Sequence, residues 1–360
     1  MAGLSGKEGR NRTRGVPHHT RRRQAPGGRS LLRRGWRLLT QTGDLERAAR
    51  RTHADVYLLG SMPPMLGGVG ARLAKNARTV YILQDIFPDT ALLMGRLTEG
   101  NPAVRLARGM EKRAYRGNTA LVTLSEDMKK NLLAKGVPEE KITVIPNWAD
   151  TGALCHIDRA DNPLFDEWSL GRDGFYALYA GVLGRLQDPG VLLDAAKLLA
   201  CEKEITLLIA GGGAMRAMVS RRVETEHIGN VRLLPLLPPE RVSQVYSLGD
   251  VALVPLKKGV TACAMPSKTW TAMAAGTPVI AAAAPGSAFS EVVLRSGGGF
   301  CVPPEDAPAL AEAIRRAYMN RAALPETGGR GRAFMERELT RESAAKAYYR
   351  VCLGKGEREH

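Results

Sequence analysis

Short apolar runs and amphipathic stretches alternate along this chain, and that alternation constrains its fold more than any other feature. Ten runs are typical of buried strands, at 55–60, 79–83, 119–123, 142–145, 175–180, 205–209, 231–234, 251–254, 278–280 and 299–302. Helices are expected among them, at about 31–51, 63–73, 103–116, 126–135, 191–199, from 215, 307–319 and 341–353. Strands that alternate with helices build βαβ units, which form parallel sheets. The sequence therefore predicts an α/β protein.

A change of composition divides these strands into two series. Residues 150–172 are rich in Gly, Asp, Asn and Pro, and the alternation resumes after them. A chain of 360 residues also exceeds the usual size of one domain. We expect a basic, disordered tail at 1–30, a first domain at 31–160, a second domain at 161–335 and a final helix within 336–360. A cleft between the two domains is the expected ligand site.

The positive charge is concentrated near the N-terminus. Residues 1–54 hold 14 Lys and Arg against three Asp and Glu, so +11 of the net charge of +16 lies there. Residues 1–30 have too few apolar side chains to offset their ordering entropy. Such a tail is attracted to anionic lipid or nucleic acid, or is solvated without a specific role. Without interleaved aromatic residues for base stacking, a specific nucleic-acid partner is not expected.

Other residue patterns exclude several classes of protein. The five cysteines are scattered and form no CxxC pair, which argues against a zinc site and against a disulfide framework. The chain has no apolar run of about 20 residues and no apolar segment typical of a secretory signal. These features predict a cytoplasmic protein.

One segment has the pattern of an anion site at the start of a helix. Pro266 suits a helix's first turn, and Ser267 and Lys268 follow it, where backbone N–H groups lack helical partners. Small residues continue the helix to Gly276, which suits a left-handed cap, and Pro278 prevents its extension. The segment fits a phosphate site or an ordinary helix-to-strand connection.

Glycine-rich loops follow the first two strands of the second half. Gly181 and Gly184 precede Arg185, and Gly211, Gly212 and Gly213 follow the next strand. Glycine permits close backbone approach to a ligand, and arginine brings five donors and a permanent charge. The dinucleotide pattern GxGxxG fails because Arg216 takes its last position. Each loop alone also fits a tight βα turn, but together with Ser267 and Lys268 they favour an anionic nucleotide.

Two carboxylates follow the strand at 79–83. Asp85 and Asp89 lie at its carboxyl end, where open α/β sheets bind ligands. Carboxylates in such places also cap helices. Both roles remain open from the residues alone.

Six motifs follow one another along the chain: Gln84-Asp-Ile-Phe-Pro-Asp89, Ile145-Pro-Asn-Trp-Ala-Asp150, Tyr179-Ala-Gly-Val-Leu-Gly-Arg185, Asp250-Val-Ala-Leu-Val-Pro255, Pro266-Ser-Lys268 and Met273-Ala-Ala-Gly-Thr-Pro-Val-Ile280. In this order they resemble the family-4 glycosyltransferases, in particular bacterial members of the colanic-acid type that assemble exopolysaccharide, capsule or O-antigen. The resemblance covers roughly residues 55–350. It implies the GT-B fold, in which two Rossmann-like domains face a cleft and a C-terminal helix returns to the first domain.

The resemblance also implies an activity and a set of site residues. Family members transfer sugar from a nucleotide-diphosphate donor, usually with retention of anomeric configuration and without a metal or other cofactor. The implied catalytic residues are Asp85, facing the sugar, with Arg185 and Lys268 neutralising the diphosphate leaving group. The implied donor-binding residues are Gly181, Gly184, Arg185, Gly211, Gly212, Pro266, Ser267, Lys268 and Thr271. Residues 235–238 are expected near the base, with backbone donors from Leu236 and Leu237 because proline has no N–H.

The chain departs from the family pattern in two places. Many members carry two glutamates at the positions held here by Cys263 and Thr271, so a carboxylate for the donor ribose is absent, and the Thr271 hydroxyl is its expected substitute. Members also begin with a strand and a Gly-rich loop, for which residues 1–30 offer no counterpart. We expect the first domain to lack that strand and loop and to be less stable for it.

Three functions are consistent with this pattern. The first is a glycosyltransferase of cell-surface polysaccharide synthesis that acts on a saccharide or lipid-linked acceptor at the inner membrane face, with peripheral contact to anionic lipid. The second is a related sugar-nucleotide epimerase, a class that relies on acidic and His residues in the cleft. The third is a non-catalytic protein that only binds nucleotide. The first accounts for most of the motifs.

Overall fold

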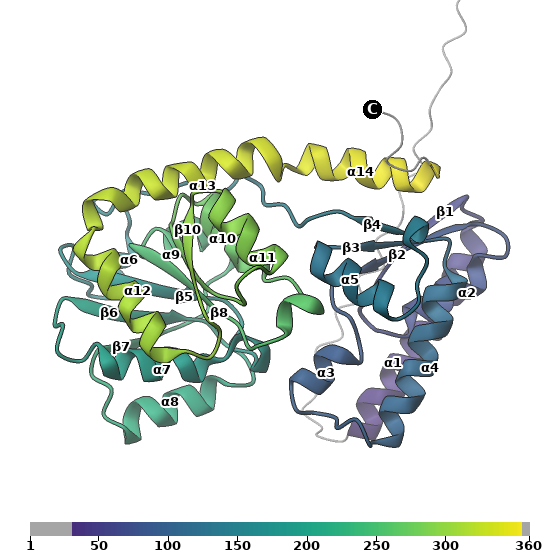
Figure 1. Cartoon of the computed structure of the whole chain (residues 1–360), viewed down its shortest axis with the longest axis horizontal. Coiled ribbons are helices and arrows are strands. Elements are labelled where there is room, and N and C mark those ends of the chain that lie inside the picture. The colour runs from purple at the N-terminus through teal and green to yellow at the C-terminus, as the bar shows by residue number, and fades with distance from the viewer. Residues whose placement is uncertain (1–30, 355–360) are drawn as a thin grey trace, which may run out of the picture.

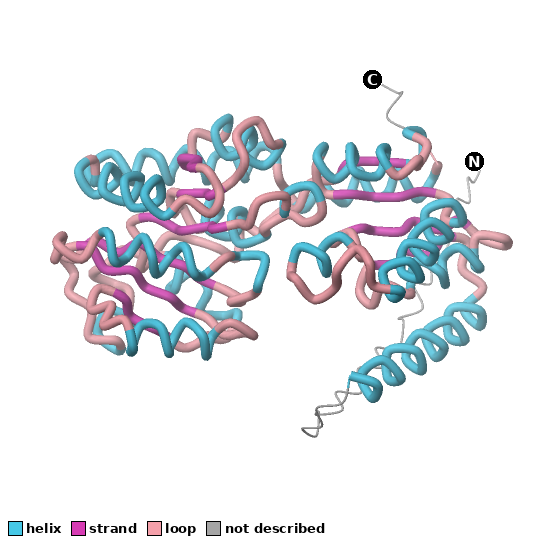
Figure 2. The backbone as a smooth tube through the Cα atoms, turned by 60° about the horizontal axis from the view of Figure 1, so that its bottom comes forward, coloured by secondary structure: helices cyan, strands magenta, loops and turns pink. Residues whose placement is uncertain are grey.

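Two parallel sheets, each with helices packed on it, make up the part of the chain that the computed structural model describes, residues 31–354 (Figure 1). The basic tail predicted at 1–30 and the last six residues lie outside the described residues, as do the side chains of 31–39. Helices lie on both faces of the sheets (Figure 2). No described helix has the length and apolar character needed to span a bilayer.

The described first domain holds a four-stranded sheet whose strand order follows the chain, β1-β2-β3-β4. Its strands are β1 (Val56–Gly60), β2 (Arg78–Leu83), β3 (Ala120–Thr123) and β4 (Ile142–Val144), all parallel. Its helices are α1 (Leu31–Thr52), α2 (Leu66–Leu73), α3 (Asp89–Leu93), α4 (Pro102–Gly117) and α5 (Glu126–Ala134), with the 3₁₀ turn η1 (Glu139–Lys141). Strand order therefore does not reverse within the described part of this sheet.

The second domain holds six parallel strands in the order β10-β9-β8-β5-β6-β7. They are β5 (Phe175–Ala180), β6 (Ile205–Ala210), β7 (Val231–Leu234), β8 (Val251–Pro255), β9 (Val279–Ala282) and β10 (Gly299–Val302). Successive strands run outward from β5 to β7, and the chain then returns to place β8 on the other side of β5. Open α/β sheets bind ligands at the carboxyl ends of the strands beside such a reversal.

Helices and 3₁₀ turns link these six strands and lie on both faces of their sheet. They are α6 (Leu164–Glu167), η2 (Arg185–Gln187), α7 (Pro189–Leu198), α8 (Arg216–Thr225), η3 (Pro239–Arg241), α9 (Val242–Tyr246), η4 (Val260–Ala262), α10 (Ser267–Ala274), α11 (Ala288–Arg295) and α12 (Ala307–Met319). All six residues of β5 are buried, because helices cover both faces of a central parallel strand. By contrast, Leu58 of β1 is 54% exposed at the border of the described first sheet.

The chain ends by crossing back over both domains. After the 3₁₀ turn η5 (Arg321–Ala323), helices α13 (Leu324–Glu338) and α14 (Arg341–Leu353) run along one side of the molecule (Figure 1). Ala344 and Val351 of α14 pack with Val80 and Val122 of the first sheet. The Arg78 Nε also donates to the Val351 carbonyl over 2.8 Å. The last helix therefore connects the second domain to the first.

The prediction of an α/β protein with two parallel sheets is confirmed, and the ten predicted strands are present. Gly276 has the expected left-handed conformation, with φ of 74°. Sequence analysis missed α3, α6, α9, α11 and α13. Three of these helices have only four or five residues, too short to show helical periodicity. Gly328, Gly329 and Gly331 weaken the helical signal of α13.

Those glycines allow α13 to approach the turn after α10, and this gives the first prediction. A Cβ at Gly328 would lie 1.9 Å from the Gly276 carbonyl oxygen, whereas a Cβ at its exposed neighbour Gly329 would meet nothing within 4 Å. We expect Gly328→Ala to lower the free energy of unfolding by about 2 kcal/mol or more, because a packed core resists added volume. Gly329→Ala should raise it by about 0.5 kcal/mol through helix propensity. Urea denaturation measures both, and equal midpoints for the two variants would contradict this packing.

Candidate active site

A pocket of about 400 Å³ lies at the carboxyl ends of β5 and β6, beside the reversal of strand order. Its volume falls in the range of small-molecule sites. We call it the switch-point pocket. It is lined by Ala180, Gly181, Val182, Gln187, Ala210, Pro235, Leu236, Leu237, Pro238, Val242, Val245, Tyr246, Met265, Pro266, Ser267, Lys268 and Thr271.

The start of α10 forms one side of the pocket, as the sequence predicts. Pro266 is the N-cap residue, and Ser267 and Lys268 occupy the first helical positions. The first turn of a helix directs backbone N–H groups and a partial positive charge toward its ligand. Thr271 lies one turn later on the same side, and its hydroxyl donates to the Ser267 carbonyl over 3.4 Å. The arrangement is suited to an anion.

The amine of Lys268 lies against a buried tyrosine. Its Nζ donates a 2.7 Å hydrogen bond to the Tyr179 hydroxyl and lies 4.0 Å from the centre of the Tyr179 ring. The Tyr179 hydroxyl in turn donates to the Val182 carbonyl over 2.6 Å. Burial lowers the pKa of Lys268 to about 7. The amine can therefore change its charge near neutral pH when an anion arrives.

The glycine-rich loops serve different purposes. Gly181 lines the pocket with φ of 128°, and a Cβ there would lie 3.9 Å from the Lys268 Nζ. A Cβ at Gly211 would lie only 1.9 Å from the Gly181 carbonyl oxygen, so Gly211 lets the two loops pack together. Gly212 has open space around its Cα, and Gly184 precedes η2. Among these four, Gly181 alone is in the described lining of the pocket.

Arg185 lies at the start of η2 and is exposed. It is absent from the described lining of the pocket, and within residues 31–354 it forms no hydrogen bond or ion pair. Its neighbour Gln187, which sequence analysis did not select, does line the pocket. The structure therefore brings Pro266, Ser267, Lys268, Thr271 and Gly181 together and leaves Arg185 outside the group.

The opposite side of the pocket is apolar. Residues 235–238, expected near a base, line it, and Leu236 is 64% exposed. Val242, Val245 and Tyr246 of α9 complete this side. Sequence analysis did not select these three residues, because α9 has only five residues and is too short to show helical periodicity. A planar, partly apolar group fits against such a surface while its edge meets backbone donors.

The first domain contacts the segment that leads into α10. Asp85 pairs with Ala264 as an isolated antiparallel bridge, and the Ile86 N–H donates to the Cys263 carbonyl over 2.8 Å. The Asn131 side chain donates to the Ala262 carbonyl over 2.8 Å. Burial raises the pKa of Asp85, whose backbone N–H donates to the Ser61 hydroxyl. Asp85 therefore lies beside the segment that leads into α10, and its bridge partner Ala264 is two residues before Pro266.

Asp89, the second carboxylate of that loop, belongs to a network of polar side chains. It accepts from Asn131 over 3.0 Å and lies 2.8 Å from the Lys135 Nζ and 3.4 Å from an Arg108 nitrogen. Lys135 also pairs with the buried Glu111. Through these contacts Asp89 joins α3, α4 and α5.

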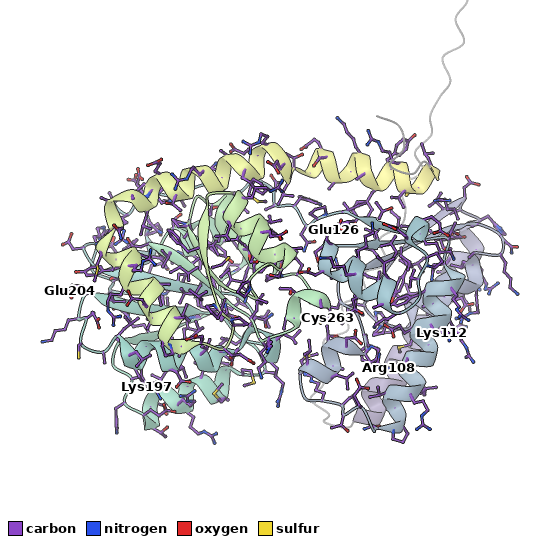
Figure 3. The ribbon with its side chains drawn as sticks, in the orientation of Figure 1. Arg108, Lys112, Glu126, Lys197, Glu204 and Cys263 are labelled. Carbon is purple, nitrogen blue, oxygen red and sulfur yellow. The ribbon has the colours of Figure 1, made fainter. Side chains whose placement is uncertain are left out.

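Cys263 and Thr271, which stand at the two positions where the resemblance implies glutamate, have different surroundings. Cys263 lies where the domains meet (Figure 3) and packs in the core of the first domain. Burial, with Asp89 and Asp85 nearby, raises the pKa of its thiol to about 12. This neutral thiol cannot replace a carboxylate, whereas Thr271 lines the pocket with a hydroxyl. Within residues 31–354, no group of three or more His, Cys, Asp and Glu side chains is arranged to hold a metal.

Comparisons with known proteins give one consistent result. The family described as glycosyl transferases group 1 matches residues 175–320, and a glycosyl transferase 4-like domain matches residues 3–148. A protein of Escherichia coli K12 described as a colanic acid biosynthesis glycosyl transferase, WcaI, is 27% identical over 85% of this chain and 76% of its own length. The glycosyltransferase WbjE of Pseudomonas aeruginosa is 29% identical over 79% of this chain and 72% of its own length.

Solved structures share the fold. A sucrose-phosphate synthase of Thermosynechococcus elongatus superimposes with a TM-score of 0.72 at 21% identity, covering 89% of this chain and 80% of its own. The Anabaena protein HepE, solved in complex with UDP-glucose, superimposes with a TM-score of 0.70 at 17% identity, covering 86% of this chain and 81% of its own. These likenesses show that the two sheets form a GT-B fold.

The lowered pKa of Lys268 gives a prediction that needs no ligand. Between about pH 7 and pH 10 the unfolded chain binds a proton at this lysine that the folded chain does not, so the lysine's contribution to stability becomes more favourable as the pH rises. Lys268→Met has no such proton, so its free energy of unfolding should not fall in this way. As the pH falls from about 10 to about 7, we expect the free energy of unfolding of Lys268→Met to rise relative to that of the wild type by roughly 1–3 kcal/mol, after allowance for solvent screening. Urea denaturation of both proteins at several pH values measures this difference in stability. A difference that does not change with pH would show that the pKa of Lys268 is not lowered by folding.

Proposed function

Because the chain belongs to the group 1, or family-4, glycosyltransferases, we propose that its switch-point pocket binds the nucleotide diphosphate of the sugar donor. One observation supports this assignment above the others. Lys268 and the start of α10 meet the Gly181 backbone at the reversal of strand order, and the described lining contains no carboxylate. A diphosphate placed there meets a cation, a helix N-terminus and a backbone that allows close approach.

The chemistry of sugar transfer explains why positively charged groups would surround the diphosphate. Transfer breaks the bond between the anomeric carbon and the diphosphate oxygen and forms a bond from that carbon to an acceptor hydroxyl oxygen. The electron pair of the broken bond stays on the diphosphate, and the hydroxyl proton leaves the acceptor. Fixed donors and cations stabilise the charge that develops on the leaving group without reorganisation. In our proposal Lys268 and the α10 N–H groups have this role, and Arg185 joins them once the donor is bound.

The apolar side of the pocket suits the base. A pyrimidine or purine ring would pack against Val242, Val245 and Tyr246, and its edge would meet the backbone N–H groups of Leu236 and Leu237. The Thr271 hydroxyl, which lies on α10 beside the diphosphate position, would face the ribose. UDP is the first nucleotide to test, since the Anabaena structure holds UDP-glucose within a similar fold.

Asp85 is our candidate for the sugar end of the donor. The Asp85–Ala264 bridge holds it beside the segment that leads into α10, and its raised pKa reflects a carboxyl held away from bulk water. A carboxyl in that position can hydrogen-bond the transferred sugar. We further propose that transfer retains the anomeric configuration, as is usual in the family.

The acceptor is proposed to be a saccharide or lipid-linked saccharide of a cell-surface polysaccharide. The description of one relative, WcaI, supports this class because it names colanic acid biosynthesis. The excess of +11 at residues 1–54 would favour contact with the anionic face of the inner membrane. A sugar-nucleotide epimerase is less well supported, because neither a carboxylate nor a His lines the described pocket.

Calorimetric titration with UDP, GDP and their sugar conjugates tests the donor site. Loss of a charge-assisted hydrogen bond costs about 1.5–3 kcal/mol, so we expect Lys268→Met to weaken binding by about 10- to 150-fold. Lys203→Met removes an exposed lysine just before β6, at the opposite end of the strands, and serves as the matched control. Arg185→Met should weaken binding less than Lys268→Met.

Two outcomes would contradict the proposal. One is a folded wild-type protein that binds none of these nucleotides. The other is binding that Lys268→Met and Lys203→Met reduce equally, which would place the diphosphate elsewhere.

The Thr271 hydroxyl makes a separate prediction about the ribose. A neutral hydrogen bond contributes about 0.5–1.5 kcal/mol and a charged one about 1.5–3 kcal/mol. We therefore expect UDP to bind no more than about 10-fold more tightly than 2′-deoxy-UDP. Thr271→Glu should increase that ratio, provided the carboxylate reaches the ribose hydroxyls. A ratio of about 100 or more in the wild type would show a strong ribose contact that the lining residues do not explain.

A further inference from the structure

Tyr179 connects the two parts of the switch-point pocket that face the proposed diphosphate. It belongs to β5 and is completely buried, with its hydroxyl between Lys268 of α10 and the Val182 carbonyl of the glycine loop. The directions of the two hydrogen bonds are fixed. The hydroxyl uses its only proton on Val182, so it must accept from the amine of Lys268.

This geometry holds the amine in place before any ligand arrives. A lysine side chain has four rotatable bonds, and its position in an empty pocket is usually poorly defined. Here the hydroxyl sets the direction of one N–H, and the ring face packs under the amine at 4.0 Å from its centre. The Nζ also lies beside Gly181, where a ligand phosphate can approach because that residue has no side chain.

Among the described residues no carboxylate forms an ion pair with the Lys268 amine that would hold its ammonium form. The neighbouring elements carry titratable or charged groups, among them Tyr246 on α9, Arg185 and Asp188 around η2, Lys257 ahead of η4, Asp85 at the bridge to Ala264, and Arg332 on α13, which packs on α10. Within the described residues none of them forms a hydrogen bond or ion pair with the Lys268 amine, which donates to the Tyr179 hydroxyl instead. Burial raises the pKa of Tyr179, so that hydroxyl stays neutral.

We propose that Tyr179 is a positioning residue of the donor site: its hydroxyl holds the amine of Lys268 beside the glycine loop. When a diphosphate binds, the amine takes up a proton without leaving that position. This inference rests on the proposed donor site. The proton comes from solvent, and the dianionic diphosphate supplies the negative charge that the empty pocket lacks. The lowered pKa of Lys268 agrees with this direction of transfer.

Tyr179→Phe separates positioning from simple packing. The variant keeps the ring and its volume and loses the hydroxyl that accepts from Lys268 and donates to Val182. Tyr176→Phe is the matched control, because it removes another β5 hydroxyl, one that donates to the Gly171 carbonyl over 2.8 Å. Both variants lose one tyrosine hydrogen bond to a backbone carbonyl, and only Tyr179→Phe affects Lys268.

Titration calorimetry with UDP-glucose in buffers of different ionisation enthalpy counts the protons taken up. UDP-glucose is the probe because its diphosphate has no ionisation of its own near neutral pH. We expect the wild type to take up nearly one proton at about pH 8.5 and close to none at about pH 6. Tyr179→Phe should bind about 5- to 20-fold more weakly at about pH 8.5, with the midpoint of its pH–affinity curve at lower pH. Tyr176→Phe should match the wild type in both quantities.

A second measurement examines Lys268 without nucleotide. Competitive labelling with acetic anhydride across pH, read by mass spectrometry, reports when each lysine loses its proton. We expect a midpoint near pH 7 for Lys268 in the wild type and Tyr176→Phe, and a lower midpoint in Tyr179→Phe, whose ammonium form has lost its acceptor.

The outcomes separate this inference from the proposed function. UDP-glucose binding without proton uptake, or a Tyr179→Phe variant that matches the wild type in affinity, proton count and labelling, overturns the role of Tyr179 and leaves the donor site standing. Absence of binding of any nucleotide by the folded wild type overturns the donor site, and the inference with it.

Discussion

The position of one lysine amine without a carboxylate partner determines how this site works. Lys268 lies at the start of α10, where the helix dipole is already unfavourable for a cation, and its polar partner among the described residues is the neutral hydroxyl of Tyr179. A buried ammonium without an anion is costly, so such a site is incomplete until an anion enters. The strand reversal beside β5, the glycine at 181 and the short helix α9 all place their groups around that position.

Contacts between the domains converge on the segment that leads into the same helix. Residues 262–264 accept hydrogen bonds from Asn131 and Ile86 and pair with Asp85, and Cys263 packs among side chains of the first domain. On the other side of the molecule, α14 packs on the first sheet. The start of α10 is therefore held by contacts with both domains. This would fix the position of the donor phosphates relative to the sugar end of the donor.

Much of this fold could be predicted from residue patterns, because strand burial and helix periodicity are local signals. The start and end of α10 could be predicted for the same reason, since Pro266, Ser267, Lys268 and Gly276 mark a helix within eleven residues. Tyr179 could not, because a tyrosine inside an apolar strand looks the same whether its hydroxyl meets a backbone carbonyl or a functional amine. Gly211 was predicted as a binding residue, and its place beneath Gly181 depends on how two loops pack, which one sequence does not show. The exposed position of Arg185 likewise depends on the fold of η2.

A crystal structure of the protein with UDP would show directly whether Lys268 holds the diphosphate. We expect the diphosphate at the start of α10, with a phosphate oxygen within about 3 Å of the Lys268 Nζ and with Tyr179 still beneath that amine. A diphosphate bound away from α10, or a Lys268 that turns out of the pocket when UDP is present, would contradict this expectation.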